Sequence, residues 1–168
     1  MWLALFSSER SSVLSDLDIQ ILKKQPDGFT FTLTKPRNTG DPRPLTTIAF
    51  PCFKEDSTLC PLKCLESYLN ATSEFRSLPE CKKLFLSTLR PHRHVSKSTI
   101  ARWLCDTVTA SGIDSTIFKA HSTRATSTST AAKKQLPLND NLIMGDWTSF
   151  STFQRFYYKL LLSLGFLM

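Results

Sequence analysis

Four residues in the C-terminal third of the sequence could together bind and cleave a phosphodiester. His121 and Arg124 are followed by Trp147 and then by Tyr157. Cleavage of a phosphodiester needs a nucleophile, donors that neutralise charge on the non-bridging oxygens, and a proton for the departing oxygen. A tyrosine hydroxyl can act as the nucleophile, and a guanidinium fork and an indole N–H suit a phosphate. The residue types therefore indicate phosphoryl-transfer chemistry.

His121 and Arg124 stand three residues apart at the start of a segment rich in serine, threonine and alanine. At this spacing in a helix, both side chains are expected to project from one face and to reach a single anion. A lone His-x-x-Arg more often marks a capped helix with a solvated face, because a short motif is only a hypothesis. The presence of Trp147 and Tyr157 downstream favours the phosphate site.

The order of these residues resembles that of the tyrosine recombinases, also called phage integrases. The similarity is closest to the eukaryotic branch carried by Crypton and DIRS-type mobile elements, in which a His-Ser-Thr-Arg box precedes a Trp-Thr/Ser-Ser segment and a Phe-Tyr pair. Here these are His121–Arg124, Trp147–Ser149 and Phe156–Tyr157. The resemblance covers nearly the whole chain, with Arg10 in the place of the first catalytic arginine and Lys35 in the place of the catalytic lysine.

The resemblance implies a role for each residue. Tyr157 would be the nucleophile, Arg10 and Arg124 a clamp on the non-bridging oxygens, and Lys35 the general acid. Arginine suits the clamp because its fork binds phosphate in bidentate fashion, and lysine suits the acid because its pKa can fall beside two arginines. Arg10 matches by position, since its neighbours depart from the family's Gly-x-Arg followed two residues later by an acid.

Two further roles follow from the same resemblance. His121 would assist removal of the tyrosine proton or donate a hydrogen bond to a phosphate oxygen. Trp147 would occupy the family's second His-or-Trp position and donate from its indole N–H. In isolation, Tyr157 and Tyr158 would more often be core and surface residues of an amphipathic helix, and Trp147 an anchor in the core.

Two of these assignments have alternatives in the sequence. Tyr158 is adjacent to Tyr157, and helical geometry allows only one of them to face Arg124. The Phe-Tyr pair of the family favours Tyr157. Lys35 shares its loop with Arg37 and Arg43, which are also cations.

The reaction implied is site-specific cleavage and rejoining of DNA through a 3′-phosphotyrosine, as in recombination and integration. It needs neither a metal nor a nucleotide cofactor. The expected partners are double-stranded DNA and further copies of the chain, as four protomers on two duplexes, with no membrane and no small-molecule substrate.

Composition favours a polyanionic partner, either nucleic acid or an acidic membrane surface, and charge alone does not choose between them. Lysine and arginine number 21 against 14 aspartate and glutamate, which gives a net charge of +7. The five cysteines are odd in number and follow no secretory signal, so a reducing interior is expected, nuclear if the cell is eukaryotic. Their spacing matches no common zinc framework.

The 168 residues suit one domain, 1–168, of an α+β, mainly helical fold with a small three-stranded antiparallel sheet. We expect a first helix from Trp2 to about Leu14. Alternating apolar residues predict strands at 18–22, 29–34 and 45–50, with a turn at 26–28. Further helices are expected after a cap at Ser57 or Thr58, after a cap at Ser96 or Ser98, from His121 to before Pro137, at 139–144, and from Phe150 to about Leu164.

One departure from the family suggests a second function. Relatives carry an N-terminal helical domain that closes around the duplex, and this sequence begins about nine residues before Arg10. We therefore expect that domain to be absent. The alternative function is a DNA-binding or protein-interaction module, a truncated or inactive copy derived from a mobile-element recombinase.

Overall fold

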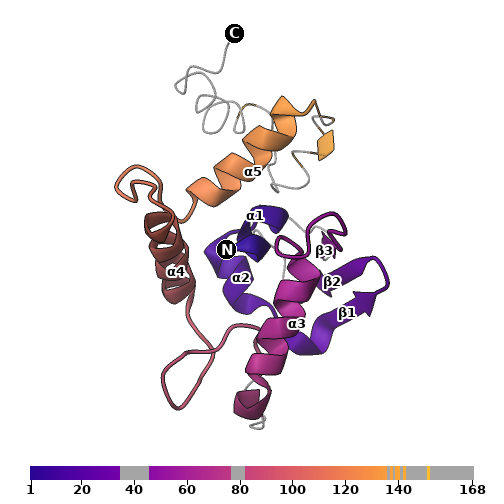
Figure 1. Cartoon of the computed structure of the whole chain (residues 1–168), viewed down its shortest axis with the longest axis vertical. Helices are drawn as coiled ribbons and strands as arrows, with labels where there is room; N and C mark the ends of the chain where they lie inside the picture. The colour runs from indigo at the N-terminus through magenta and orange to yellow at the C-terminus, as the bar shows by residue number, and fades with distance from the viewer. Residues whose placement is uncertain are drawn as a thin grey trace.

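The computed structural model describes residues 1–34, 46–76 and 82–135, together with positions 137, 139, 140, 142 and 151. In this part of the chain, five α-helices accompany a three-stranded antiparallel sheet in the order β1-β2-β3 (Figure 1). The α-helices are α1 (Trp2–Ser7), α2 (Ser11–Asp16), α3 (Pro61–Ala71), α4 (Lys97–Ala110) and α5 (Ser122–Lys133). The strands are β1 (Leu22–Gln25), β2 (Gly28–Thr32) and β3 (Thr47–Pro51), and the 3-10 helices are η1 (Ile19–Ile21) and η2 (Ser73–Arg76). The predicted α+β fold, mainly helical with a three-stranded sheet, is confirmed.

β2 and β3 form where the sequence predicts the second and third strands, and the turn before β2 lies at the predicted place. β1 and β2 are joined by a two-residue turn, since Gln25 pairs with Gly28. Gly28 has a φ of 155°, and a Cβ there would collide with the carbonyl oxygen of Phe50 on β3. Phe29 pairs with Phe50, and the two rings stack with centroids 4.6 Å apart. Glycine therefore allows β3 to approach β2 closely enough for this stack.

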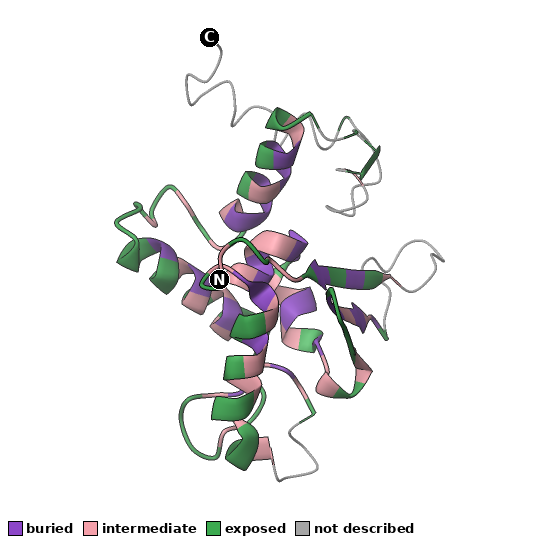
Figure 2. Ribbon diagram, turned by 45° about the vertical axis from the view of Figure 1, so that its right-hand side comes forward, coloured by how far each residue is buried: buried purple, intermediate pink, exposed green. Residues whose placement is uncertain are grey.

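The hydrophobic core lies between the sheet and helices α1 to α4. Buried residues of these elements form one hydrophobic cluster, and Figure 2 shows buried and exposed residues alternating along the helices and strands. Apolar residues line the inner side of β2 and β3 because alternate positions of a strand point to the same face. The most deeply buried large side chains of the cluster are Leu14, Leu17, Phe29, Phe31, Phe50, Leu65 and Leu84.

The N-terminal helix is shorter than predicted. α1 ends at Ser7, Ser8 adopts the left-handed region with φ 55° and ψ 23°, and α2 begins at Ser11. The Ser7 hydroxyl donates to the Leu3 carbonyl at 2.6 Å and accepts from the Glu9 N–H at 3.2 Å. Serine side chains compete with helical backbone bonds in this way. The prediction of one helix from Trp2 to Leu14 was therefore wrong at Ser8.

The strand predicted at 18–22 was also wrong. The Asp18 carboxylate accepts from the Gln20 N–H at 2.9 Å and so starts the 3-10 helix η1. β1 begins only at Leu22, where this turn ends. The local contact of the Asp18 side chain therefore determines the structure of this segment, and the alternation of apolar residues does not.

The helix caps were predicted with mixed success. Ser96 caps α4 and accepts from the Thr99 N–H at 3.3 Å, as predicted. α3 has Cys60 as its N-cap residue and Pro61 as its first residue. Thr58 is instead held by Asp56, which accepts from its N–H at 2.8 Å and from its hydroxyl at 2.6 Å. The cap predicted at Ser57 or Thr58 was therefore wrong.

Beyond α5 the structure describes single positions. Asn139, Asp140, Leu142 and Ser151 are helical, in the segments where helices were predicted. The remainder of the helices predicted at 139–144 and 150–164 lies outside the described residues. Within the described chain, every helix is too short or too polar to cross a bilayer.

Candidate active site

α5 carries the His-Ser-Thr-Arg box and packs on α1. The Ser127 hydroxyl lies within 2.6 Å of the Leu5 carbonyl of α1 and 2.9 Å of the Thr123 carbonyl. The buried face of α5 consists of small polar residues and alanines around one arginine, and these residues are Thr123, Arg124, Ala125, Thr128, Ser129 and Ala131. Hydroxyls can be buried here because they hydrogen-bond to carbonyls of the preceding turn, as Thr128 does to Arg124 at 2.8 Å.

Arg124 is buried at the junction of α5 with the N-terminal segment. Its side chain belongs to a residue that is 3% exposed, and Nη1 donates to the Ser8 carbonyl oxygen at 3.3 Å. Ser8 itself is fully buried and forms the left-handed turn that ends α1. The turn therefore presents a backbone acceptor to the guanidinium from 116 residues away in the sequence.

Arg10 lies two residues beyond that carbonyl. It is the N-cap residue of α2, with an extended backbone at φ −73° and ψ 151°, and it is exposed. The two arginines predicted to form the clamp thus come to one junction from distant parts of the chain. Arg124 enters it from the protein interior and Arg10 lies on its solvent side.

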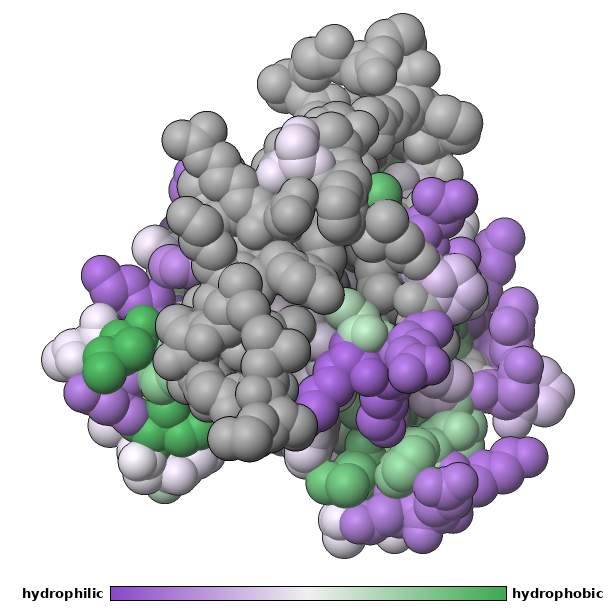
Figure 3. All heavy atoms as spheres, turned by 90° about the horizontal axis from the view of Figure 1, so that it is seen from above, coloured by the Kyte–Doolittle hydropathy of each residue, from purple (hydrophilic) through white to green (hydrophobic). Residues whose placement is uncertain are grey.

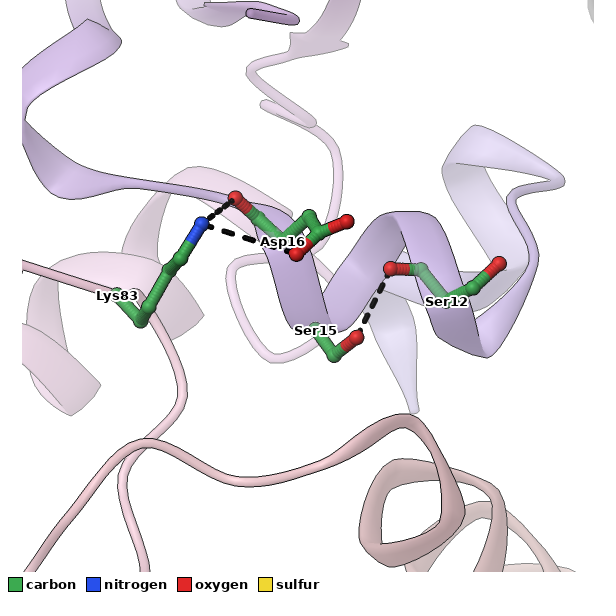
Figure 4. Close-up of polar contacts among 4 residues, drawn as sticks. All are labelled: Ser12, Ser15, Asp16 and Lys83. Carbon is green, nitrogen blue, oxygen red and sulfur yellow. Dashed lines mark hydrogen bonds and ion pairs between the residues drawn. The ribbon is translucent and has the colours of Figure 1, made fainter. Parts of the chain in front are cut away.

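The helix that begins at Arg10 is held at its other end. Lys83 Nζ donates to the Asp16 carbonyl at 2.7 Å and lies 3.8 Å from an oxygen of the Asp16 carboxylate (Figure 4). Within α2, the Ser15 hydroxyl donates to the Ser12 carbonyl at 2.8 Å. A cation at the C-terminal end of a helix also interacts favourably with the negative end of the helix dipole. These contacts fix the direction of α2 and with it the place of Arg10.

His121 lies at the other edge of α5, in a different environment from Arg124. It is the N-cap residue of the helix, it is exposed, and it makes no side-chain capping hydrogen bond. Arg124 is turned inward against Ser8, and the prediction that it and His121 reach a single anion stays a prediction. His121 remains accessible from solvent.

Three predicted site residues cannot be placed. Lys35, Trp147 and Tyr157 lie outside the described residues, as does the competing Tyr158. Their roles stay predictions. Of the six residues, the structure brings Arg10 and Arg124 to one junction and puts His121 at the start of the same helix as Arg124.

Sequence reasoning missed two residues of this junction, Ser8 and Glu9. Ser8 supplies the carbonyl for Arg124, and no residue type signals such a backbone contact. Glu9 is 2% exposed, and Glu9 and Arg124 are the two buried charged residues of the described chain. A buried charge requires compensation, so opposite charges on the two sides of one junction are favourable. The position of Glu9, an acidic residue next to Arg10, was the one feature of the sequence that could have indicated its part in the junction.

A large cavity lies beside α5, on the side of α1 and α4. This cavity of about 690 Å³ opens between α1, the end of α4 and the first turns of α5, and apolar side chains such as Trp2, Leu5 and Phe118 line much of it. Seen from above, hydrophobic side chains reach the surface in small areas among hydrophilic ones (Figure 3). The described residues include no group of three or more His, Cys, Asp or Glu side chains that could hold a metal ion.

Comparisons with known proteins identify the fold. No family model and no curated protein matches the sequence. Among solved structures, the chain is similar to XerA recombinase, with a TM-score of 0.67 and 17% identity over 96% of this chain and 56% of that chain. It is also similar to XerH site-specific recombinase bound to a palindromic difH substrate in a post-cleavage complex, with a TM-score of 0.66 and 15% identity over 97% of this chain and 43% of that chain.

The chain thus spans about half the length of these recombinases. At such low identity the similarity concerns the fold. The tyrosine recombinase catalytic-domain fold predicted from the sequence is therefore confirmed.

Proposed function

We propose that this chain is a tyrosine-type DNA recombinase that cuts and rejoins DNA at specific sites through a 3′-phosphotyrosyl intermediate. The observation that carries the proposal is the hydrogen bond from Arg124 to the Ser8 carbonyl, two residues before Arg10 in the sequence, within a recombinase-like fold. The His-Ser-Thr-Arg box supports an origin in the Crypton and DIRS-type branch of mobile elements.

Arg10 and Arg124 would bind the two non-bridging oxygens of the scissile phosphate. Both stay charged at any physiological pH, and the fork of each can donate two parallel hydrogen bonds. Burial of Arg124 supports this role, because a donor held by the protein needs little reorganisation when negative charge grows on the phosphate. Exposure of Arg10 supports access of a duplex to the junction.

The chemical step would use four further residues. The Tyr157 oxygen attacks phosphorus while His121 assists loss of its proton, and the bond from phosphorus to the 5′ oxygen breaks. Lys35 gives a proton to that oxygen, which leaves as a 5′ hydroxyl, and Trp147 donates to a phosphate oxygen. A 5′ hydroxyl of a second strand then attacks the phosphotyrosine and releases Tyr157. One phosphoester bond is exchanged for another at each step.

The proposed partner is double-stranded DNA, and recombination would proceed in a tetramer of the chain on two duplexes. The net charge of +7 supports binding to a polyanion. XerH, which shares the fold, was seen with its DNA substrate. In a eukaryotic cell the chain would act in the nucleus.

The test is a search for a covalent DNA adduct. The protein is incubated with duplexes from a random library, each nicked near its centre so that cleavage releases a short oligonucleotide and traps the phosphotyrosine. We expect an adduct that survives denaturation and maps to Tyr157 by peptide sequencing. Tyr157→Phe should remove the adduct and keep DNA binding, and the matched variant Tyr158→Phe should keep both.

Each other outcome has a defined meaning. An adduct that persists in Tyr157→Phe and disappears in Tyr158→Phe would make Tyr158 the nucleophile. Tight, salt-dependent binding without any adduct would reject the recombinase and leave a DNA-binding module derived from one. Absence of both binding and adduct would reject a DNA function.

A further inference from the structure

Two cysteines face each other between the sheet and α3. Cys52 directly follows β3, and Cys60 is the N-cap residue of α3. Their sulfur atoms lie 3.7 Å apart, and both thiols are free. The contact joins residues that are eight positions apart and closes the loop between the two elements.

The backbone around the pair is fixed on both sides. The Cys52 N–H donates to the Asp27 carbonyl at 2.7 Å, which ties Cys52 to the turn between β1 and β2. The Phe53 N–H donates to Cys60 Sγ at 3.3 Å. Cys60 is fully buried and Cys52 is partly exposed. One sulfur is therefore sheltered and the other belongs to a residue that solvent can reach.

The surroundings make the two sulfurs chemically different. Burial disfavours the Cys60 thiolate, but backbone N–H groups of Lys63, Phe53 and Leu62 stabilise it and lower the pKa of Cys60 overall. The hydrogen bond to Cys60, followed by partial burial, raises the pKa of Cys52. The pair thus holds a proton on Cys52 and favours negative charge on Cys60, the arrangement of an attacking thiolate beside a second sulfur.

We propose that Cys52 and Cys60 are a redox modification site that forms a reversible disulfide with a peroxide as the oxidant. The sulfur atoms must approach by about 1.6 Å to reach a bond of about 2.05 Å, a movement that side-chain rotation can supply. The bridge would connect the end of β3 to the start of α3.

The reaction consumes one hydrogen peroxide. Cys52, which solvent can reach, first gives up its proton, and its thiolate attacks one peroxide oxygen and becomes a sulfenic acid; the other oxygen leaves as hydroxide and takes up that proton to become water. The Cys60 thiolate then attacks the Cys52 sulfur and displaces the hydroxyl, which takes up a proton and leaves as a second water. Two thiols are oxidised to one disulfide, and the peroxide is reduced to two waters. A dithiol reductant reverses the change.

Tryptic mapping can test this site directly. Trypsin cleaves after Lys54 and Lys63, so Cys52, Cys60 and Cys64 fall in three different peptides. The folded full-length chain is treated with a small excess of hydrogen peroxide, blocked with N-ethylmaleimide and digested without reductant. We expect the Cys52–Cys60 linked pair to exceed any pair containing Cys64 by at least about tenfold, because reaction follows sulfur proximity.

The control is the same treatment in denaturant, where the preference should fall. Cys64→Ser should keep the linked pair, since Cys64 is exposed and one helical turn away. Cys52→Ser should abolish the linked pair. Because Cys52 is partly exposed, this variant should still fold. Two results would overturn the proposal. In one, Cys52 and Cys60 of the folded protein are still labelled by N-ethylmaleimide although Cys64 has been oxidised. In the other, all pairs of linked cysteine peptides appear in equal yield.

Discussion

Arg124 Nη1 donates to the carbonyl oxygen of Ser8, and this hydrogen bond joins α5 to the left-handed turn between α1 and α2. Arg10 follows two residues later on the solvent side of the turn. A residue on α5 thereby supports the segment that carries the other arginine. The two arginines should consequently differ in their contribution to stability, although the same catalytic role is proposed for both.

Arg124→Ala should lower the free energy of unfolding by about 2 kcal/mol, because a buried charged group and its hydrogen bond are lost. Arg10→Ala should change it by about 0.5 kcal/mol or less, since Arg10 is exposed, yet should reduce adduct formation on the order of 100-fold. Urea denaturation and the nicked-duplex assay measure the two effects. Equal destabilisation by both substitutions would contradict this division.

Ser127→Ala should destabilise the chain by about 1 kcal/mol, because the Leu5 carbonyl of α1 loses its donor at the α5 contact. Thr130→Ala is the matched control on the exposed side of the same helix. Alanine has the higher helix propensity, so this control should be neutral or slightly stabilising. Thermal unfolding of the two variants decides the matter, and no difference between them would mean that the α1–α5 contact adds little stability.

Gly28→Ala should be severely destabilising, by about 3 kcal/mol or more, because its Cβ would collide with the Phe50 carbonyl and separate β2 from β3. Gly112 also has a positive φ, of 76°, but its surroundings are open to 4 Å. Gly112→Ala should therefore cost about 1 kcal/mol for backbone strain alone. Circular dichroism during denaturation compares the two variants. A mild Gly28→Ala variant would show that β3 can shift.

Asp114 gives a pH prediction. The Thr116 hydroxyl donates to its carboxylate at 2.7 Å and the Thr116 N–H at 2.8 Å, and these bonds hold the pKa of Asp114 below its ordinary value. A carboxyl whose folded pKa is depressed adds stability above its unfolded pKa, and this stability disappears as pH falls through the folded pKa. Carbon-detected NMR should find the lowered pKa.

Thr116→Val should move the pKa of Asp114 back toward its ordinary value, because the hydroxyl is the largest cause of the shift. Asp56 makes the same two contacts with Thr58 and provides an unchanged internal reference in that variant. An Asp114 that titrates alike in both proteins would contradict the assignment.

The sheet was predictable because its determinants are local. Phe29, Phe31 and Phe50 occupy alternate positions of their strands, and Pro26 with Gly28 marks the turn. The cap at Ser96 was equally visible, since its acceptor and the helix it starts are neighbours in the sequence. The same reasoning predicted one helix across Ser7 and Ser11 and missed the turn at Ser8. The Ser8 carbonyl accepts from Arg124, which lies 116 residues away, so local sequence does not reveal this contact.

The residue types and order of the candidate site come from a resemblance that covers nearly the whole chain, and the roles of these residues stay predictions. Periodicity did not predict the environment of Arg124, because its burial depends on the distant turn at Ser8, whereas His121 is exposed. Burial of Glu9 was hidden for a similar reason. A charged residue in a short polar segment reads as solvated until its buried counterpart is known.

The Ser8–Arg124 hydrogen bond also has a consequence for synthesis of the protein. A ribosome adds about 5–20 residues per second, so α1 leaves it on the order of 10 s before α5. During that interval α1 lacks the helix that packs on it, and its apolar residues have only partial cover. Arg124 therefore cannot reach the Ser8 carbonyl until α5 has been synthesised, so the nascent chain holds the turn at Ser8 without this hydrogen bond in the meantime.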